Sequence, residues 1–190
     1  MVMASLWILR GSWILTALIW VFASVYSKPT VKQGSPKARL LYLVLAIVGG
    51  FCIGDKVLHW GWLGHRFLPF SPRILMVGAL LTALGCAYAI WARAVLGTNW
   101  SGGPAVKQDH VLIQNGPYAL TRHPIYTGFL TAVLGTTIAV ARYRAILGFP
   151  LVFFSLLVKT RQEEELMAQS FPDDYPRYRS RVRALIPWIF

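Results

Sequence analysis

ILMVGALLTALGCAYAIWA, residues 74–92, is a stretch in which no side chain carries a charge. A helix that crosses a bilayer needs about 20 mostly apolar residues, because lipid offers its backbone no hydrogen-bond partners. The stretch meets that requirement and predicts a membrane-spanning helix over residues 73–96. It also makes the bilayer the expected environment for the rest of the chain.

Four further apolar runs predict additional spans. They cover residues 6–26, 40–58, 124–141 and 145–158. The first is long and lacks a good cleavage signal, so we expect a retained helix rather than a signal peptide. The last is short for a span, but its helical pattern continues through residues 159–169 and predicts a helix that leaves the membrane. We therefore expect an all-α integral membrane protein with about five transmembrane helices and a cytoplasmic C-terminal helical segment.

The composition agrees with a bilayer environment. Hydrophobic residues make up 56% of the 190-residue chain, charged residues make up 14%, and the mean hydropathy is +0.52. Soluble domains are about half apolar and a quarter charged. The formal net charge of +12 does not indicate nucleic-acid binding, because the basic residues lie between apolar runs. Cys52 and Cys86 both lie inside apolar runs, which favours small buried side chains over a disulfide framework.

Loop charges predict the orientation, since basic residues concentrate in cytoplasmic loops. With five spans and a cytoplasmic C-terminus, twelve basic residues face the cytoplasm: Lys28, Lys32, Lys37, Arg39, Lys107, Arg122, Lys159, Arg161, Arg177, Arg179, Arg181 and Arg183. Four face the other side: Arg66, Arg73, Arg142 and Arg144. This bias predicts that two polar segments, residues 97–126 and 159–187, lie together on the cytoplasmic side.

The chain shows no internal repeat, and we expect one membrane-embedded domain over residues 1–190. Residues 1–96 supply three apolar spans. Residues 97–190 form a catalytic half with two spans and a cytoplasmic tail. In that tail, the sequence predicts a second short helix that starts at Ser170–Pro172 and ends at Pro187.

Two other charged features are typical of a membrane border. Asp55 and Lys56, near the end of the second apolar run, predict an interfacial ion pair, although an ionisable residue inside a membrane is also a functional candidate. Four arginines recur at every second position, namely Arg177, Arg179, Arg181 and Arg183. On a helix they spread around the axis, which predicts attraction to anionic lipid rather than one binding face.

The first polar segment contains Gly116-Pro117-Tyr118 and Arg122-His123-Pro124-Ile125-Tyr126. A residue before proline avoids the α region and proline suits the first helical position, so His123 is expected just before a helix that begins at Pro124. The free N–H groups of that helix start favour an anion, and Arg122 adds a positive charge. Tyr118 and Tyr126 offer aromatic faces for a flat ring or a cation. The alternative is a polar cluster at the membrane border.

The second polar segment is rich in acids. On a helix, Lys159 faces Glu163 and Arg161 faces Glu165 at i,i+4, which alone predicts solvated ion pairs. The three adjacent carboxylates Glu163–Glu165 cannot all pair on one helical face. One or two of them therefore remain for a ligand hydroxyl or cation.

The two segments together resemble a known family. Gly-Pro-Tyr, then Arg-His-Pro-x-Tyr-x-Gly, then Glu-Glu about 40 residues later and Tyr-x-x-Tyr before a proline are similar to the isoprenylcysteine carboxyl methyltransferase family. Its relatives, the membrane phospholipid N-methyltransferases and the methanethiol S-methyltransferases, share the pattern. The resemblance covers roughly residues 93–187 and implies S-adenosylmethionine as the cofactor.

The resemblance also implies roles for single residues. The cofactor site combines the family's positions with the helix-start residues: His110, Val111, Leu112, Ile113, Tyr118, Arg122, His123, Pro124, Ile125, Tyr126, Glu163 and Glu164. Glu163 stands where the family has a cofactor-binding glutamate, with Glu164 and Glu165 as alternatives. The family's substrate-contacting arginine falls on Lys159, with Arg161 nearby, so these two are the catalytic candidates. Lysine lacks the planar fork with which arginine grips a carboxylate.

The chemistry favours a carboxylate as methyl acceptor. A carboxylate is already ionised at pH 7, so positioning and partial desolvation suffice for an in-line transfer. An amine or thiol has to lose a proton, and His110 and His123 are the only evident bases. We therefore expect a lipophilic or lipidated isoprenylcysteine-like acceptor drawn from membrane lipid, and neither nucleic acid nor metal. The alternatives are a phospholipid amine or thiol methyltransferase, a nicotinamide-dependent relative, and a non-enzymatic membrane subunit.

Overall fold

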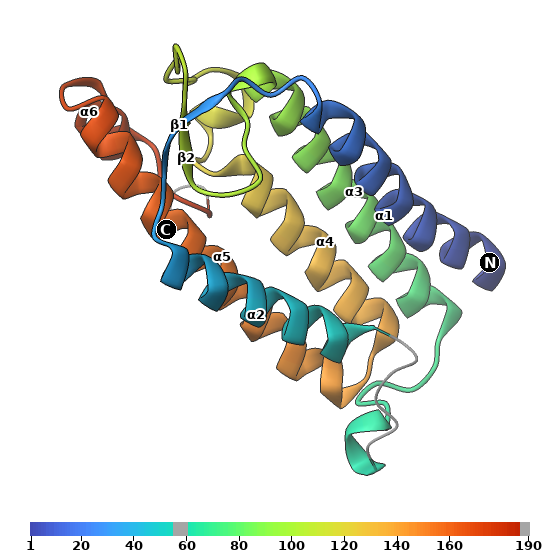
Figure 1. Ribbon diagram of the computed structural model, residues 1–190. Coiled ribbons are helices and arrows are strands. Elements are labelled where there is room, and N and C mark those ends of the chain that lie inside the picture. Colours follow the sequence, from blue (N-terminus) through green and yellow to red (C-terminus); the bar gives the residue numbers. More distant parts are fainter. Residues whose placement is uncertain (55–60, 187–190) are drawn as a thin grey trace.

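The computed structural model describes residues 1–54 and 61–186 and is built mostly from helices (Figure 1). These are α1 (Val2–Ser24), α2 (Pro36–Ile53), α3 (Pro72–Leu96), α4 (Pro124–Val140), α5 (Tyr143–Ser170) and α6 (Asp174–Arg181), with 3-10 turns at Gly61–Gly64, Gly97–Asn99 and Gly116–Ala119. The predicted Asp55–Lys56 pair, the end of the second run at Leu58 and the helix stop at Pro187 lie outside the described residues.

The expectation of a helical multi-span membrane protein is confirmed. Within the described residues, four helices are long and apolar enough to cross a bilayer: α1, α2, α5, and α3 extended through Asn99. Helix α4 is an apolar helix of 17 residues and is shorter than these. A fifth span at α4 therefore stays a prediction, since a crossing helix needs about 20 residues unless the bilayer thins around it.

Helices α3 and α4 pack with their backbones in contact. Gly78 and Gly85 on α3 face Gly128 and Gly135 on α4, and a Cβ added at Gly85 would lie 2.6 Å from the carbonyl oxygen of Gly128. Lipid offers helices no hydrophobic reason to associate, so close approach at small residues supplies the packing energy. The glycines at seven-residue spacing thus hold the centre of the bundle together.

A larger side chain at this contact is expected to separate the two helices. Gly85→Leu should destabilise the fold by about 3 kcal/mol, because backbone atoms cannot move aside as a flexible side chain can. The measurement is thermal unfolding of the purified protein in detergent. Gly11→Leu on α1 is the control, since a Cβ there meets nothing within 4 Å. Equal unfolding temperatures for the two variants would contradict this packing.

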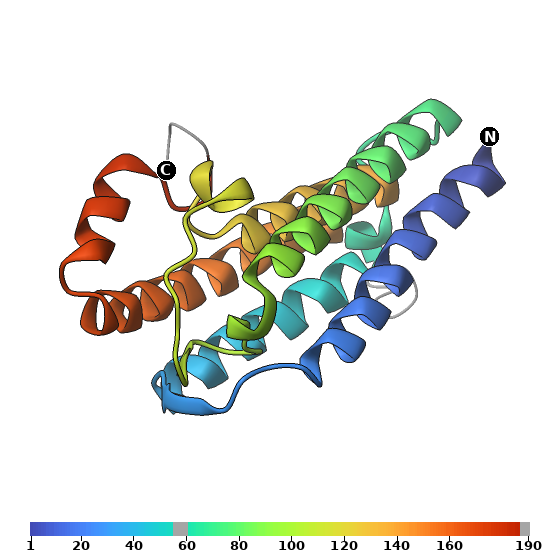
Figure 2. The same ribbon diagram turned by 90° about the horizontal axis from the view of Figure 1, so that it is seen from above.

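The other helices flank this pair. Helix α2 packs on α5 through Gly49 and Gly148, and Ser155 donates a hydrogen bond to the carbonyl of Tyr42 (2.7 Å). Helix α1 packs on α3, and its Trp13 donates to Thr136 of α4 (3.0 Å). Seen from above, α1 and α2 both lie on one side of the bundle (Figure 2).

A small antiparallel ribbon, which the all-α expectation did not include, joins two loops. Strand β1 (Thr30–Gln33) pairs with β2 (Ala105–Lys107). The C-terminal segment reaches the same end of the bundle, because the N–H groups of Arg122 and His123 donate to the carbonyls of Arg183 and Ala184. The predicted grouping of the basic loops and tail at one end is therefore confirmed (Figure 1). The cytoplasmic placement of that end stays a prediction.

The tail departs in part from the sequence prediction. Helix α5 continues without a break to Ser170, as expected, although Pro150 lies inside it. The predicted second helix start at Ser170–Pro172 is wrong, because Phe171 still closes α5 by donating to Met167. Helix α6 begins at Asp174 and ends at Arg181.

Candidate active site

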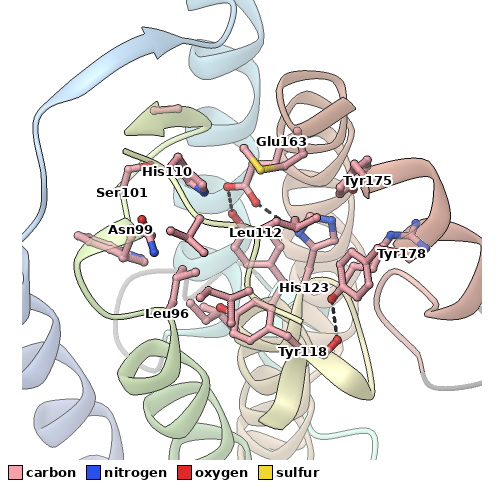
Figure 3. A pocket seen from close by; sticks show the side chains of 18 residues that line it. Leu96, Asn99, Ser101, His110, Leu112, Tyr118, His123, Glu163, Tyr175 and Tyr178 are labelled. Atoms are coloured by element: carbon pink, nitrogen blue, oxygen red, sulfur yellow. Dashed lines mark hydrogen bonds and ion pairs between the residues drawn. The ribbon is translucent and has the colours of Figure 1, made fainter. Parts of the chain in front are cut away.

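A cavity of about 780 Å³, including the open space at its mouth, lies where the loop after α3, the start of α4, the end of α5 and α6 meet (Figure 3). Ten of the predicted cofactor residues line it: His110, Val111, Leu112, Ile113, Tyr118, Arg122, His123, Ile125, Tyr126 and Glu163. Pro124 and Glu164 stand behind the wall. The lining also includes residues that were not named as candidates: Leu96, Asn99, Trp100, Ser101, Ala105, Met167, Tyr175 and Tyr178.

His123 stands at the point where the chain turns into α4. It is the residue before the helix, with φ −124° and ψ 61°, and Pro124 begins the first turn. Proline imposes both features, so the expected local geometry is confirmed. The imidazole is 8% exposed and stacks on Tyr126, with ring centroids 5.6 Å apart and planes within 3°.

Two neighbouring carboxylates on α5 grip His123 from either side. Its Nδ1 lies 3.3 Å from Glu163, and its Nε2 lies 3.4 Å from Glu164. Tyr126 also donates its hydroxyl hydrogen to Glu163. The two glutamates differ in place, because Glu163 lines the cavity whereas Glu164 turns toward Arg122. Glu165 is exposed on the outer face of α5.

These contacts set the charge of the histidine. Burial by itself lowers the pKa of His123, but hydrogen bonds to Glu163 and Glu164 and their negative charges outweigh it and leave the pKa above its usual value. The two carboxylates therefore stabilise the protonated, cationic form of the imidazole. A protonated ring with both N–H groups engaged has no lone pair with which to act as a base.

The guanidinium of Arg122 already binds other groups of the protein. Its Nε and Nη2 donate to Glu164 at 2.9 and 2.5 Å, and its Nη1 donates to the carbonyls of Val182 and Arg179. The sequence suggested a ligand anion at this helix start, but the structure places the Glu164 carboxylate there. A planar guanidinium suits such a two-bond grip, and it ties α5 to the C-terminal segment.

Lys159 and Arg161, the two catalytic candidates, lie outside the cavity wall. The ammonium of Lys159 donates to the carbonyl of Gly102 (3.1 Å) and sits 5.1 Å from the ring centroid of Tyr126. Arg161 is exposed, and two positions on a helix place it on the side opposite Glu163. The expected i,i+4 pairs with Glu163 and Glu165 are not among the ion pairs of the described residues.

The loop wall contributes a neutral histidine. His110 accepts a hydrogen bond at Nδ1 from the N–H of Lys107 (3.2 Å), which leaves the hydrogen on Nε2. Burial lowers the pKa of His110, and the charges of Lys28 and Lys107 lower it further. The ring is therefore a neutral donor toward the cavity and not a base.

Helix α6 contributes two tyrosines, Tyr175 and Tyr178, to the cavity wall. Tyr178 donates its hydroxyl hydrogen to the carbonyl of Tyr118 (2.6 Å), a contact drawn in Figure 3. Burial raises the pKa values of Tyr118, Tyr175 and Tyr178, so all three are neutral phenols. The sequence signal for Tyr175 and Tyr178 was their place in the Tyr-x-x-Tyr pattern.

The turn after α3 adds a polar and an apolar group. The side-chain oxygen of Asn99 is buried and, among the described residues, has no hydrogen-bond partner. Trp100 next to it packs against Trp20 of α1, with ring centroids 6.4 Å apart, and under the guanidinium of Arg93. Leu96, Ile113 and Phe129 belong to the same apolar cluster. The cavity thus has an ionic wall on one side and an apolar wall that reaches α1 on the other.

Known proteins resemble this chain in the same region. Residues 76–169 match the model of the Isoprenylcysteine carboxyl methyltransferase (ICMT) family. The Protein-S-isoprenylcysteine O-methyltransferase of Schizosaccharomyces pombe is 40% identical over 85 residues, which cover 43% of this chain and 35% of that protein. The Saccharomyces cerevisiae protein of the same name is 30% identical over 117 residues, which cover 60% and 49%.

A solved structure shares the fold. The eukaryotic intramembrane Ras methyltransferase ICMT (isoprenylcysteine carboxyl methyltransferase) superposes with a TM-score of 0.50 at 22% identity, over 80% of this chain and 52% of that one. The chain thus spans about half or less of the length of these relatives. In sequence, residues 76–169 of this chain therefore match the isoprenylcysteine carboxyl methyltransferase family, and the fold agrees with that match.

Proposed function

We propose that this chain is an S-adenosylmethionine-dependent membrane methyltransferase that methylates the carboxylate of an isoprenylcysteine-like acceptor. The observation that carries the proposal is the two-sided cavity. Its ionic wall holds His123 and Glu163, and its apolar wall holds Leu96, Trp100 and Ile125. A polar cofactor and a lipophilic acceptor need such neighbouring surfaces. The names of the similar proteins point to the same reaction.

The lining fits the cofactor group by group. S-adenosylmethionine supplies a methyl group on a positively charged sulfur when it is bound. Glu163 would accept hydrogen bonds from the hydroxyl or ammonium groups of the cofactor, and the buried oxygen of Asn99 would accept from an N–H. The rings of Tyr118 and Tyr178 offer electron-rich faces for a cation.

The state of the two histidines favours a carboxylate acceptor over an amine or thiol. Both nitrogens of His123 are engaged as donors to carboxylates, and the free nitrogen of His110 carries its hydrogen. Neither ring therefore removes a proton from a neutral acceptor. With S-adenosylmethionine bound, a carboxylate oxygen would form the bond to the methyl carbon as the carbon–sulfur bond breaks and S-adenosylhomocysteine leaves. The acceptor would lose no proton, and the residues of the cavity would have only to align and partly dehydrate it.

The proposed location follows from the charges. The polar end of the bundle carries the basic loops and tail, so we place it, with the site, on the cytoplasmic side of the membrane. In this arrangement residues 1–96 and 97–190 form one domain. The cofactor enters from water, and the acceptor enters from lipid.

The reaction can be tested with radiolabelled S-adenosylmethionine and purified protein in lipid nanodiscs. Four acceptors are compared: an S-isoprenylated cysteine with a free carboxyl group, a smaller thioether carboxylate, phosphatidylethanolamine and a thiol. Label should enter the first as a base-labile ester, and the corresponding amide should remain unlabelled. Labelling of the amine or thiol alone would overturn the choice of acceptor. A folded protein that binds no S-adenosylhomocysteine in calorimetry would overturn the whole proposal.

The charged state of His123 predicts a pH dependence of stability. Because its pKa is raised in the fold, its stabilising contribution is complete below about pH 6.5 and is lost as the pH rises through the folded value. The unfolding temperature of wild type should therefore exceed that of His123→Gln at pH 6, and the gap should narrow by pH 9. His110, whose lowered pKa acts in the opposite direction, is present in both proteins and cancels. A gap that stays constant with pH would contradict the ionic state of His123.

A further inference from the structure

A second cavity opens at the end of the bundle opposite the candidate active site. It is lined by residues of α1, α2 and α4, with one residue each from α3 and α5, and encloses about 1280 Å³ including the open space at its mouth. We call it the Arg10 cavity, after the α1 residue on its wall. Its apolar lining includes Leu6, Leu9, Val133 and Val152. None of its lining residues takes part in the candidate active site.

Arg10 is an unusual residue for its position. It lies roughly 12 Å along the helix axis from Val2, within the apolar run of α1. Its side chain is exposed and makes no hydrogen bond or ion pair with the described protein. A charged side chain at such a depth in a bilayer is costly unless it reaches the interface or meets an opposite charge.

The wall opposite Arg10 is also basic. Arg66 and Arg142 line the cavity and are held side by side by an antiparallel backbone bridge. Arg66 donates to the carbonyl of Val140 (3.1 Å) and lies over the ring of Phe70. Among the described lining residues none is acidic. Arg10 and Arg66 thus place positive charge beside the apolar part of the described lining.

We propose that the Arg10 cavity binds one anionic phospholipid, with its phosphate between Arg10 and Arg66 and an acyl chain on the apolar lining. A phospholipid is the membrane component that carries both an anionic head and a long apolar chain. A phosphate accepts charge-assisted hydrogen bonds from arginine, and the apolar lining beside Arg10 and Arg66 suits an acyl chain. The lipid lies between α1, which packs on α3, and α2, which packs on α5.

Native mass spectrometry with added phosphatidylglycerol or phosphatidylcholine tests the proposal. Wild type should retain one phosphatidylglycerol and should unfold at a higher temperature in its presence, with no such effect of phosphatidylcholine. Arg10→Ala should weaken phosphatidylglycerol binding about five-fold, the loss that one basic side chain near a head group accounts for. Arg73→Ala is the matched control, because Arg73 is exposed at the same end of the bundle but does not line the cavity.

A second variant probes the apolar part without touching charge. Gly50 lines the cavity, and a Cβ there meets no atom within 4 Å, so Gly50→Leu adds bulk at the cavity wall without clashing with the protein. Binding should fall in Gly50→Leu and remain in Gly11→Leu, whose site is equally open but lies outside the cavity. The proposal is overturned if both lipids bind equally, if Arg73→Ala and Arg10→Ala lose the same affinity, or if Gly50→Leu binds like wild type. Loss of acceptor methylation in Gly50→Leu, with unchanged lipid binding, would instead assign the cavity to the acceptor.

Discussion

Glu163→Gln should weaken binding of S-adenosylhomocysteine about 100-fold, equivalent to about 3 kcal/mol. Glutamine keeps the size of the side chain but removes the charge that faces the cavity, holds the His123 cation and accepts from Tyr126. Methyl transfer should fall at least as far. Calorimetry measures the affinity, and thermal unfolding shows that the variant is folded.

The neighbouring acids supply the controls for this experiment. Glu165 is exposed two positions further along α5, so Glu165→Gln should bind like wild type. Tyr126→Phe removes one hydrogen bond to Glu163 and should weaken the binding of S-adenosylhomocysteine about ten-fold or less. Wild-type affinity in Glu163→Gln, together with a large loss in Glu164→Gln, would move the cofactor-binding role to Glu164.

Glu164→Ala should instead lower the free energy of unfolding, by about 3–5 kcal/mol. The variant leaves Arg122, whose side chain is 9% exposed, without its carboxylate partner, and a buried charge that loses its counter-ion is strongly destabilising. It also releases one side of His123. The measurement is the unfolding temperature in detergent, with Glu165→Ala as the exposed control.

A double variant separates this ion pair from simple loss of packing. When Arg122→Ala already removes the cation, adding Glu164→Ala should cost much less than it does in wild type, because the two side chains are directly coupled. The bonds from Arg122 to the carbonyls of Val182 and Arg179 are absent from both Arg122→Ala and the double variant, so they cancel when those two proteins are compared. Independent, additive effects would show that Arg122 and Glu164 do not stabilise the fold as a pair.

Much of the helical architecture follows from patterns that are local in sequence. A long uncharged run has few alternatives to a helix in lipid, which is why residues 73–96 predicted α3 to within a residue. The start of α4 could also be predicted from neighbouring residues alone, because Pro124 restricts both its own backbone and that of His123. The identity of most of the cavity lining followed from the resemblance of these motifs to a family.

Other features depend on contacts between segments that are distant in the sequence. The β1–β2 ribbon joins short loops that have no strand pattern of their own. The true start of α6 depends on Phe171 completing α5. Asn99 entered the site because the turn after α3 folds over the cavity, and no motif marked it.

The three acids Glu163–Glu165 show most clearly what the sequence determines and what the tertiary structure decides. The sequence alone established that three acids follow a membrane helix and that Arg-His-Pro begins another, because both are properties of short segments. It left open which acid meets a ligand and which meets Arg122. Neighbouring helical positions point about 100° apart. The rotation of α5 about its axis relative to α4 therefore decides which acid faces the cavity and which faces Arg122. That rotation turns Glu163 into the cavity, gives Glu164 to Arg122 and leaves Glu165 exposed.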